Sequence, residues 1–162
     1  MELLHIAQIL FLTALANATP IVAKRIFGTY FSFPLDVGAT FLDGQPLFGQ
    51  SKTVGGMLIS ILITTAAAPL IGLDWSIGTV VAVAAMGGDL LSSFVKRRLR
   101  LQSSSQALGL DQVPESLFPF MACYHPLSLT ITDVALGVGI FFVADLIVSR
   151  LLFQAHLRDE PY

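Results

Sequence analysis

The sequence predicts an all-α membrane protein, a bundle of about five transmembrane helices in one domain that covers residues 1–162. Of the 162 residues, 54% are hydrophobic and only 12% are charged, and the mean hydropathy is +0.76. A typical soluble domain carries about twice that share of charged residues. Each crossing of the hydrocarbon layer takes about 20 apolar residues. The chain therefore has room for five or six helices with modest loops, and for no separate soluble domain.

Five sustained apolar runs are the predicted spans. They cover residues 2–22, 57–73, 76–95, 114–132 and 134–153, with polar loops at 23–56 and 96–112. The first run has Glu2 before it and Lys24 and Arg25 after it, which is typical of an anchor rather than of a signal peptide. The second and third runs meet at a short turn that contains Asp74. Three prolines interrupt the fourth run, so this helix is predicted to face the bundle interior, where neighbours satisfy the freed backbone groups. The fifth run carries one acid, Asp145.

The basic residues predict the orientation of the bundle. With five helices and the N-terminus outside, every Lys and Arg is cytoplasmic, as the positive-inside rule requires. The short turns on the other side carry Asp74 and Asp133 and no basic residue. The nine basic residues are Lys24, Arg25, Lys52, Lys96, Arg97, Arg98, Arg100, Arg150 and Arg158. The C-terminus and both long loops are therefore expected at the cytoplasmic face of the cell membrane.

The loop before the second helix is rich in glycine and acids. Gly44 and Gly49 have the spacing of a phosphate-binding P-loop, but Lys52 comes two residues too late and no strand precedes it, which excludes a P-loop. Lys52 and Thr53 still lead into a helix N-terminus, where free N–H groups and the helix dipole bind anions. The equally simple alternative is that the glycines and acids only form turns and that Lys52 only follows the positive-inside rule.

The cytoplasmic end of the third helix carries a polar stripe. At about 100° per residue, one helical face holds Asp89, Ser93, Lys96 and Arg100. An ionised carboxylate inside a membrane usually faces a cavity, pairs with a cation or binds one. The alternative is a purely structural ion pair of Asp89 with Lys96 or Arg97.

Two further acids come at the start of the fourth helix. Asp111 and Glu115 have the positions of an N-cap and of a first-turn dipole partner, and capping alone explains both. The topology nevertheless brings Asp89 and Asp111 to the same membrane face. Mg²⁺ usually takes only one or two protein carboxylates together with waters and substrate phosphates. A shared Mg²⁺ site is therefore the second interpretation of the two aspartates, beside capping.

In these segments the chain resembles the CDP-archaeol synthase family, membrane-bound CTP-dependent cytidylyltransferases that activate a lipid phosphate, and more distantly the CDP-diacylglycerol synthases. The matching stretches are Asn17–Pro20, Leu35–Gly38, Asp43–Gly44, Leu47–Gly49, Lys52–Thr53, Gly56, Gly88–Asp89, Ser93–Phe94, Lys96–Arg98 and Gly109–Gln112. One departure concerns the metal. The wider pattern has a second acid three residues after Asp111, where this chain has Pro114, with Glu115 one position further on.

The resemblance implies that a lipid phosphate oxygen attacks the α-phosphorus of CTP, which releases pyrophosphate and leaves a CDP-lipid. Such transfers are accelerated chiefly by positioning and by cations that neutralise developing charge. The resemblance further implies that Asp89 and Asp111 bind Mg²⁺ and act with Lys96 in catalysis. The residues that it places at the nucleotide are Asp43, Gly44, Gly49, Lys52, Thr53 and Arg97, and Asp36 is left between the nucleotide and the metal.

A small polytopic transporter or channel subunit is the alternative function, because Asn17, Asp89 and Asp145 also suit a polar pathway through a bundle. A transporter would place its polar groups near the midplane with repeat symmetry, whereas these gather at one face. Asp145 has no chemical role in this prediction and either pairs with Arg150 or lines the bundle. The acceptor stays open between a diether, a diacyl and another prenyl or alkyl phosphate. Nucleic acid is not an expected partner, and a homodimer is compatible with this size.

Overall fold

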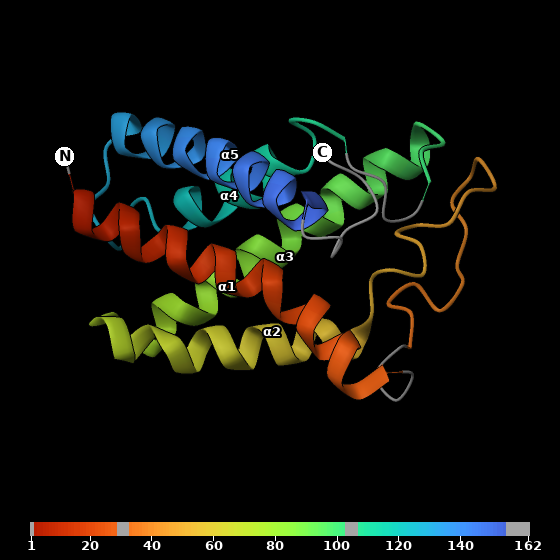
Figure 1. Ribbon diagram of the computed structural model, residues 1–162, viewed down its shortest axis with the longest axis horizontal. Helices are drawn as coiled ribbons and strands as arrows, with labels where there is room; N and C mark the ends of the chain where they lie inside the picture. The colour runs from red at the N-terminus through yellow and green to blue at the C-terminus, as the bar shows by residue number, and fades with distance from the viewer. Residues whose placement is uncertain (1, 29–32, 103–106, 155–162) are drawn as a thin grey trace.

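The computed structural model describes residues 2–28, 33–102 and 107–154, and its regular secondary structure over these ranges is entirely helical (Figure 1). The helices are α1 (Leu3–Phe27), α2 (Val54–Ala67), the 3₁₀ helix η2 (Ala68–Ile71), α3 (Trp75–Arg98), α4 (Gln112–Ala122) and α5 (Ile131–Gln154). Four segments are long and apolar enough to cross a membrane: α1, α2 together with η2, α3 and Ile131–Leu151. The prediction of an all-α membrane protein with about five helices is confirmed.

Helix α4 is much shorter than the predicted span over 114–132, because it ends at Ala122. The cause is Pro126, which lacks an N–H and whose ring would collide with the carbonyl four residues earlier, at Ala122. Pro114 is tolerated because it lies in the first turn, where backbone N–H groups have no helical partner. At about 1.5 Å per residue, α4 covers about 16 Å, roughly half the hydrocarbon layer. Turns over residues 123–128 continue the chain toward the start of α5.

Helices α1 and α3 contact each other and lie between α2 on one side and α4 with α5 on the other (Figure 1). The C-terminal ends of α1, α3 and α5 and the N-terminal ends of α2 and α4 meet at one end of the bundle, here called the loop end because both long loops lie there. All described basic residues belong to this end, and Arg158 lies outside the described residues. At the opposite end the backbone N–H of Glu2 donates to Asp133 Oδ1 at 3.2 Å. The assignment of the loop end to the cytoplasm stays a prediction.

The apolar core fills the half of the bundle away from the loop end. Its central ring is Phe120 of α4, which is fully buried beside Ile9, Leu12 and Val81. Gly137 of α5 makes room for this ring, since a Cβ at that position would lie 2.1 Å from Phe120 Cζ. Packing therefore leaves the loop end free for polar groups.

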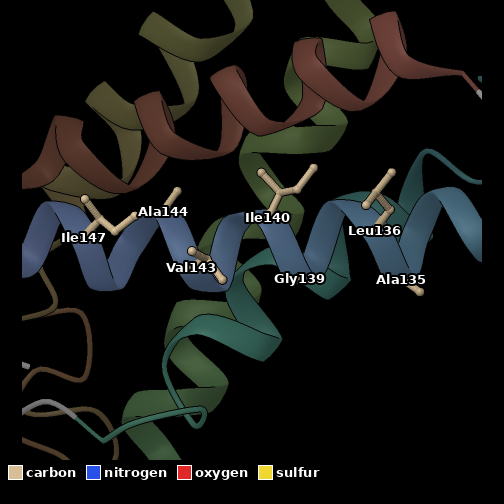
Figure 2. A pocket seen from close by; sticks show the side chains of 7 residues that line it. All are labelled: Ala135, Leu136, Gly139, Ile140, Val143, Ala144 and Ile147. Carbon is tan, nitrogen blue, oxygen red and sulfur yellow. The ribbon is translucent and has the colours of Figure 1, made fainter.

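A shallow apolar groove of about 500 Å³ follows one face of α5 (Figure 2). The residues that line it are Ala135, Leu136, Gly139, Ile140, Val143, Ala144 and Ile147. All are apolar, so this surface suits hydrocarbon chains and offers no group for phosphate or metal chemistry. The candidate site is instead at the loop end.

Candidate active site

Two ion pairs join the first loop, α3 and α4 at the loop end. Lys52 Nζ lies 2.5 Å from both carboxylate oxygens of Asp89, and Lys96 Nζ lies 2.7 Å from Asp111 Oδ1. The four side chains are between 11% and 22% exposed, so these pairs are only partly screened by water. The structural alternative for Asp89 is an ion pair with Lys96 or Arg97 of the same helix. In the structure Asp89 instead pairs with Lys52, which lies 37 positions earlier in the chain.

Glu115 brings a third carboxyl group to these pairs. It lies in the first turn of α4, and its side chain hydrogen-bonds to that of Asp89. It also interacts electrostatically with Lys52 and Asp111. Asn17 of α1 donates from Nδ2 to Glu115 Oε2 at 2.9 Å. Two carboxyl groups this close repel each other unless a proton or a cation lies between them. Their arrangement therefore provides a place where positive charge is favoured.

This acidic cluster fits a hard divalent cation that is completed by other ligands. Among the described residues, no three His, Cys, Asp or Glu side chains form a full metal cage. Mg²⁺ rarely has such a cage, because it keeps several waters and takes one or two carboxylates with substrate phosphates. Asp89 and Glu115 meet that requirement, and Asp111 lies near enough to interact with Glu115.

Asp36 organises the loop that carries Lys52. Its Oδ2 accepts from the backbone N–H groups of Phe48 at 3.1 Å and Gly49 at 3.0 Å, and its Oδ1 accepts from Gly38 N at 3.2 Å. Burial opposes ionisation of this carboxyl, but the hydrogen bonds from Gly49, Phe48 and Gly38 outweigh it and lower the pKa of Asp36 below its ordinary value. Both oxygens of Asp36 are thus used within the loop, so this carboxylate holds the shape of the loop that carries Lys52.

Arg98 fastens the tip of the same loop to the end of α3. Its Nε lies 3.0 Å from Asp43 Oδ2, and its Nη2 donates to Pro46 O at 2.6 Å. Its guanidinium also lies 4.9 Å from the ring centre of Phe41 and 4.8 Å from that of Phe94. Asp43, predicted at the nucleotide, is therefore engaged with Arg98. Sequence reasoning gave Arg98 no specific role, because its partners lie about 50 positions away.

The other residues predicted at the nucleotide have local roles that are compatible with binding. Gly44 and Gly49 have φ values of +74° and +89°, which favour glycine, so they shape the turns of the loop. The Thr53 hydroxyl caps α2 by accepting from Gly56 N at 3.2 Å. Arg97 is only 8% exposed, and its Nε has no hydrogen-bond partner among the described residues.

One residue of the predicted polar stripe is not on it. Helix α3 ends at Arg98, and Arg100 follows in a left-handed conformation with φ of +57°. Arg100 therefore does not continue the helical face of Asp89 and Lys96, because the helical period no longer applies beyond Arg98. Ser93 lies within α3 and is buried.

Comparison with known proteins gives one consistent family. The family model for CarS-like proteins, described as CDP-archaeol synthase, matches residues 2–162. A CDP-archaeol synthase of Thermofilum pendens is 38% identical over 91% of this chain and 75% of its own length. One of Sulfurisphaera tokodaii is 30% identical over 80% of this chain and 81% of its own. The chain belongs to the CDP-archaeol synthase family.

A solved structure supports the same assignment for this CDP-archaeol synthase family member. It is described as an intramembrane enzyme for archaeal membrane lipid biosynthesis, and it superposes with a TM-score of 0.69 at 29% identity. The match covers 87% of this chain and 90% of the other. The resemblance read from the sequence motifs is thus confirmed, and with it a CTP-dependent cytidylyltransferase of membrane lipid biosynthesis. These relatives give no support to the transporter or channel alternative.

Asp36 gives a test of the loop in this CDP-archaeol synthase family member. Asp36→Asn removes the charge that three backbone N–H groups share, and we expect it to lower the free energy of unfolding by about 2–3 kcal/mol. The pKa of Asp36 is lower in the folded state than its ordinary value of about 3.9. Its contribution to the free energy of unfolding is therefore present above that ordinary value and is lost as the pH falls through the folded pKa.

Thermal unfolding in detergent between pH 3 and pH 7 measures this difference. The difference in unfolding temperature between the wild type and the Asn variant should be largest near neutrality and should shrink as the pH falls below about 3.9. An equal difference at every pH would contradict the role of the ionised carboxylate.

Proposed function

We propose that the chain transfers the cytidylyl group of CTP to a lipid phosphate at the loop end of its bundle. A lipid phosphate oxygen forms a bond to the α-phosphorus of CTP, and the bond from that phosphorus to the bridging oxygen of the β-phosphate breaks. The products are a CDP-lipid and pyrophosphate. The observation that carries the proposal is the convergence of Asp89, Asp111 and Glu115 with Lys52 and Lys96.

Charge balance supports Mg²⁺ as the cofactor of this site. The hydrogen bond between Glu115 and Asp89 needs one proton, and when that proton leaves, three carboxylates face two lysines and the cluster has one excess negative charge. Asp89 and Asp111 would hold the ion, and Glu115 takes the part of the acid that the wider pattern has at position 114. A bound Mg²⁺ supplies positive charge at the phosphates of CTP. Lys52 and Lys96 would exchange their carboxylate partners for phosphate oxygens of the substrates.

The remaining groups suit the two substrates. Lys52 and Thr53 precede the N-terminus of α2, where the helix dipole favours the triphosphate. Arg97 holds a buried positive charge for the lipid phosphate or the departing pyrophosphate. The site lies at the end of four membrane-spanning segments, so water-soluble CTP and a lipid headgroup reach it from the same side. We place this side in the cytoplasm, since the basic residues gather there.

We further propose an archaeol-type diether glycerophosphate as the acceptor, because the names of the relatives state CDP-archaeol synthase activity. The homodimer and the residue roles also stay predictions. Size-exclusion chromatography with light scattering measures the oligomeric state of the protein in detergent.

Purified protein in lipid micelles, with Mg²⁺ and labelled CTP, tests the proposed reaction. We expect CDP-lipid and pyrophosphate to form in equal amounts, and only when a lipid phosphate is present. Diether, diacyl and prenyl phosphates, offered separately, identify the acceptor, and labelled ATP in place of CTP is the control for the nucleotide. Absence of a CDP-lipid with every acceptor, from protein that unfolds cooperatively, would overturn the proposal.

A further inference from the structure

Asp145 of α5 makes a specific contact with the start of α4. Its Oδ2 accepts a hydrogen bond from Gln112 Nε2 at 2.9 Å. Gln112 is only 3% exposed and is the residue directly after Asp111. The other end of the same amide, Gln112 Oε1, accepts from the backbone N–H of Gly109 at 2.8 Å. The amide therefore connects α5 to the loop that precedes α4.

The loop held in this way carries Asp111. The backbone N–H of Ala107 donates to Asp111 Oδ2 at 2.9 Å, while Asp111 Oδ1 lies 2.7 Å from Lys96 Nζ. A carboxylate oriented by both oxygens depends on the position of the loop backbone. Gln112 fixes one point of that backbone at Gly109, and Asp145 fixes Gln112.

The choice of an acid at position 145 is informative. A carboxylate accepts hydrogen bonds and donates none when ionised, so it selects the one amide orientation of Gln112 in which Nε2 faces α5 and Oε1 faces Gly109. An Asn at this position would pair with either orientation of the Gln112 amide. An acid inside a membrane helix is costly, and packing of α4 on α5 is already supplied by Phe120 against Gly137. The contact between Asp145 and Gln112 therefore orients the Gln112 amide, in addition to holding α4 against α5.

We propose that Asp145 is a positioning residue of the active site, which acts through Gln112 to hold Asp111 in the geometry that binds the metal–nucleotide complex. This inference rests on the proposed function. Direct hydrogen-bond partners of metal ligands change metal affinity or activity by about 10–100-fold, and because Asp145 acts through Gln112 and the loop backbone, we expect the lower end of that range. Asp145 does not touch the substrates.

The experiment uses the full chain in detergent with Mn²⁺ as the probe, titrated in the presence of CTP and followed by electron paramagnetic resonance. Asp145→Leu removes the acceptor, and we expect the Kd of Mn²⁺ to rise about tenfold and kcat to fall by a similar factor. Gln112→Glu places a second carboxylate against Asp145, so we expect a comparable loss. In the double variant Gln112→Glu/Asp145→Asn the Asn amide donates to Glu, which still accepts from Gly109 N, so both values should return to within about threefold of the wild type.

Asp133→Asn is the matched control, because Asp133 lies in the same helix at the opposite end. Its Oδ2 accepts from Thr130 N at 3.0 Å and from Thr130 Oγ1 at 2.7 Å, so this variant should lower the unfolding temperature and leave the Kd of Mn²⁺ unchanged. A lower unfolding temperature of Asp145→Leu with an unchanged Kd and kcat would overturn the inference, as would a double variant no better than Gln112→Glu. Wild-type protein that binds Mn²⁺–CTP but forms no CDP-lipid would refute the proposed reaction and leave the Mn²⁺ test of Asp145 in force. Wild-type protein that binds no Mn²⁺ would overturn both.

Discussion

Asp89→Asn is expected to lower the rate of CDP-lipid formation by about 10²–10³-fold, the scale found when one essential electrostatic group is removed from an active site. Asp89 accepts from Lys52 on both oxygens and is hydrogen-bonded to Glu115. An Asn amide keeps the size of the side chain but presents one oxygen and one NH₂ group, and the NH₂ group repels both Lys52 and a cation. The change therefore removes half of the carboxylate pair that fits Mg²⁺.

Activity at saturating CTP over a range of Mg²⁺ concentrations measures this loss, and thermal unfolding shows that the variant is folded. Asp74→Asn is the matched control, because Asp74 caps the other end of α3, where its Oδ1 accepts from Ser76 N at 2.8 Å. That hydrogen bond lowers the pKa of Asp74, so the control changes an ionised acid of the same helix far from the loop end. Asp89→Asn with more than a tenth of wild-type activity would contradict the assignment of Asp89 to the metal.

Hydropathy predicted the helices well because lipid imposes a long apolar run on every segment that crosses it. The predicted ends of the helices were less accurate, because the position at which a helix ends depends on local stereochemistry. Three prolines were noted in the fourth run, but only one of them, Pro126, terminates the helix, and it does so four residues before its own position. Pro114 and Pro119 are accommodated within α4. Hydropathy does not distinguish these outcomes.

The sequence predicted which charged residues gather at the loop end, but not which lysine pairs with which aspartate. Lys52, Asp89, Lys96 and Asp111 were each placed at the same end of the bundle by counting helices. Which lysine meets which aspartate depends on the path of the first loop, and that path is set by Asp36, whose partners are backbone N–H groups that no sequence pattern reports.

Some residues acquired a role only from the structure. Glu115 looked like a dipole partner from its position in the first turn, and Asp145 had no role. Both act across helices, toward Asn17 and Asp89 in one case and toward Gln112 in the other. Contacts of this kind depend on the rotation of each helix about its axis, which apolar periodicity fixes only weakly when all sides are apolar.

Gly88→Ala is expected to separate α3 from α4 and to abolish activity. A Cβ at position 88 would lie 2.3 Å from Pro114 O, 2.5 Å from Pro114 C and 2.8 Å from Glu115 Cα. These are backbone atoms, so no side-chain rotation relieves the clash, and overpacking of this kind costs about 1–3 kcal/mol or more. Asp89 follows Gly88, and Glu115 follows Pro114, so the helices can only part by moving the two carboxyl groups away from each other.

Gly87→Ala is a control of the same chemistry one residue earlier. Its Cβ would meet Phe118 Cδ2 at 3.8 Å, an ordinary contact, and alanine favours a helix over glycine by about 1 kcal/mol. We therefore expect Gly87→Ala to be neutral or stabilising and active, and Gly88→Ala to unfold at a lower temperature. The decisive measurement is the activity of Gly88→Ala well below that temperature, where the bundle is folded. Full activity there would mean that catalysis does not need the close approach of α3 and α4. A folded but inactive protein is the result expected if Gly88 keeps Asp89 and Glu115 close together.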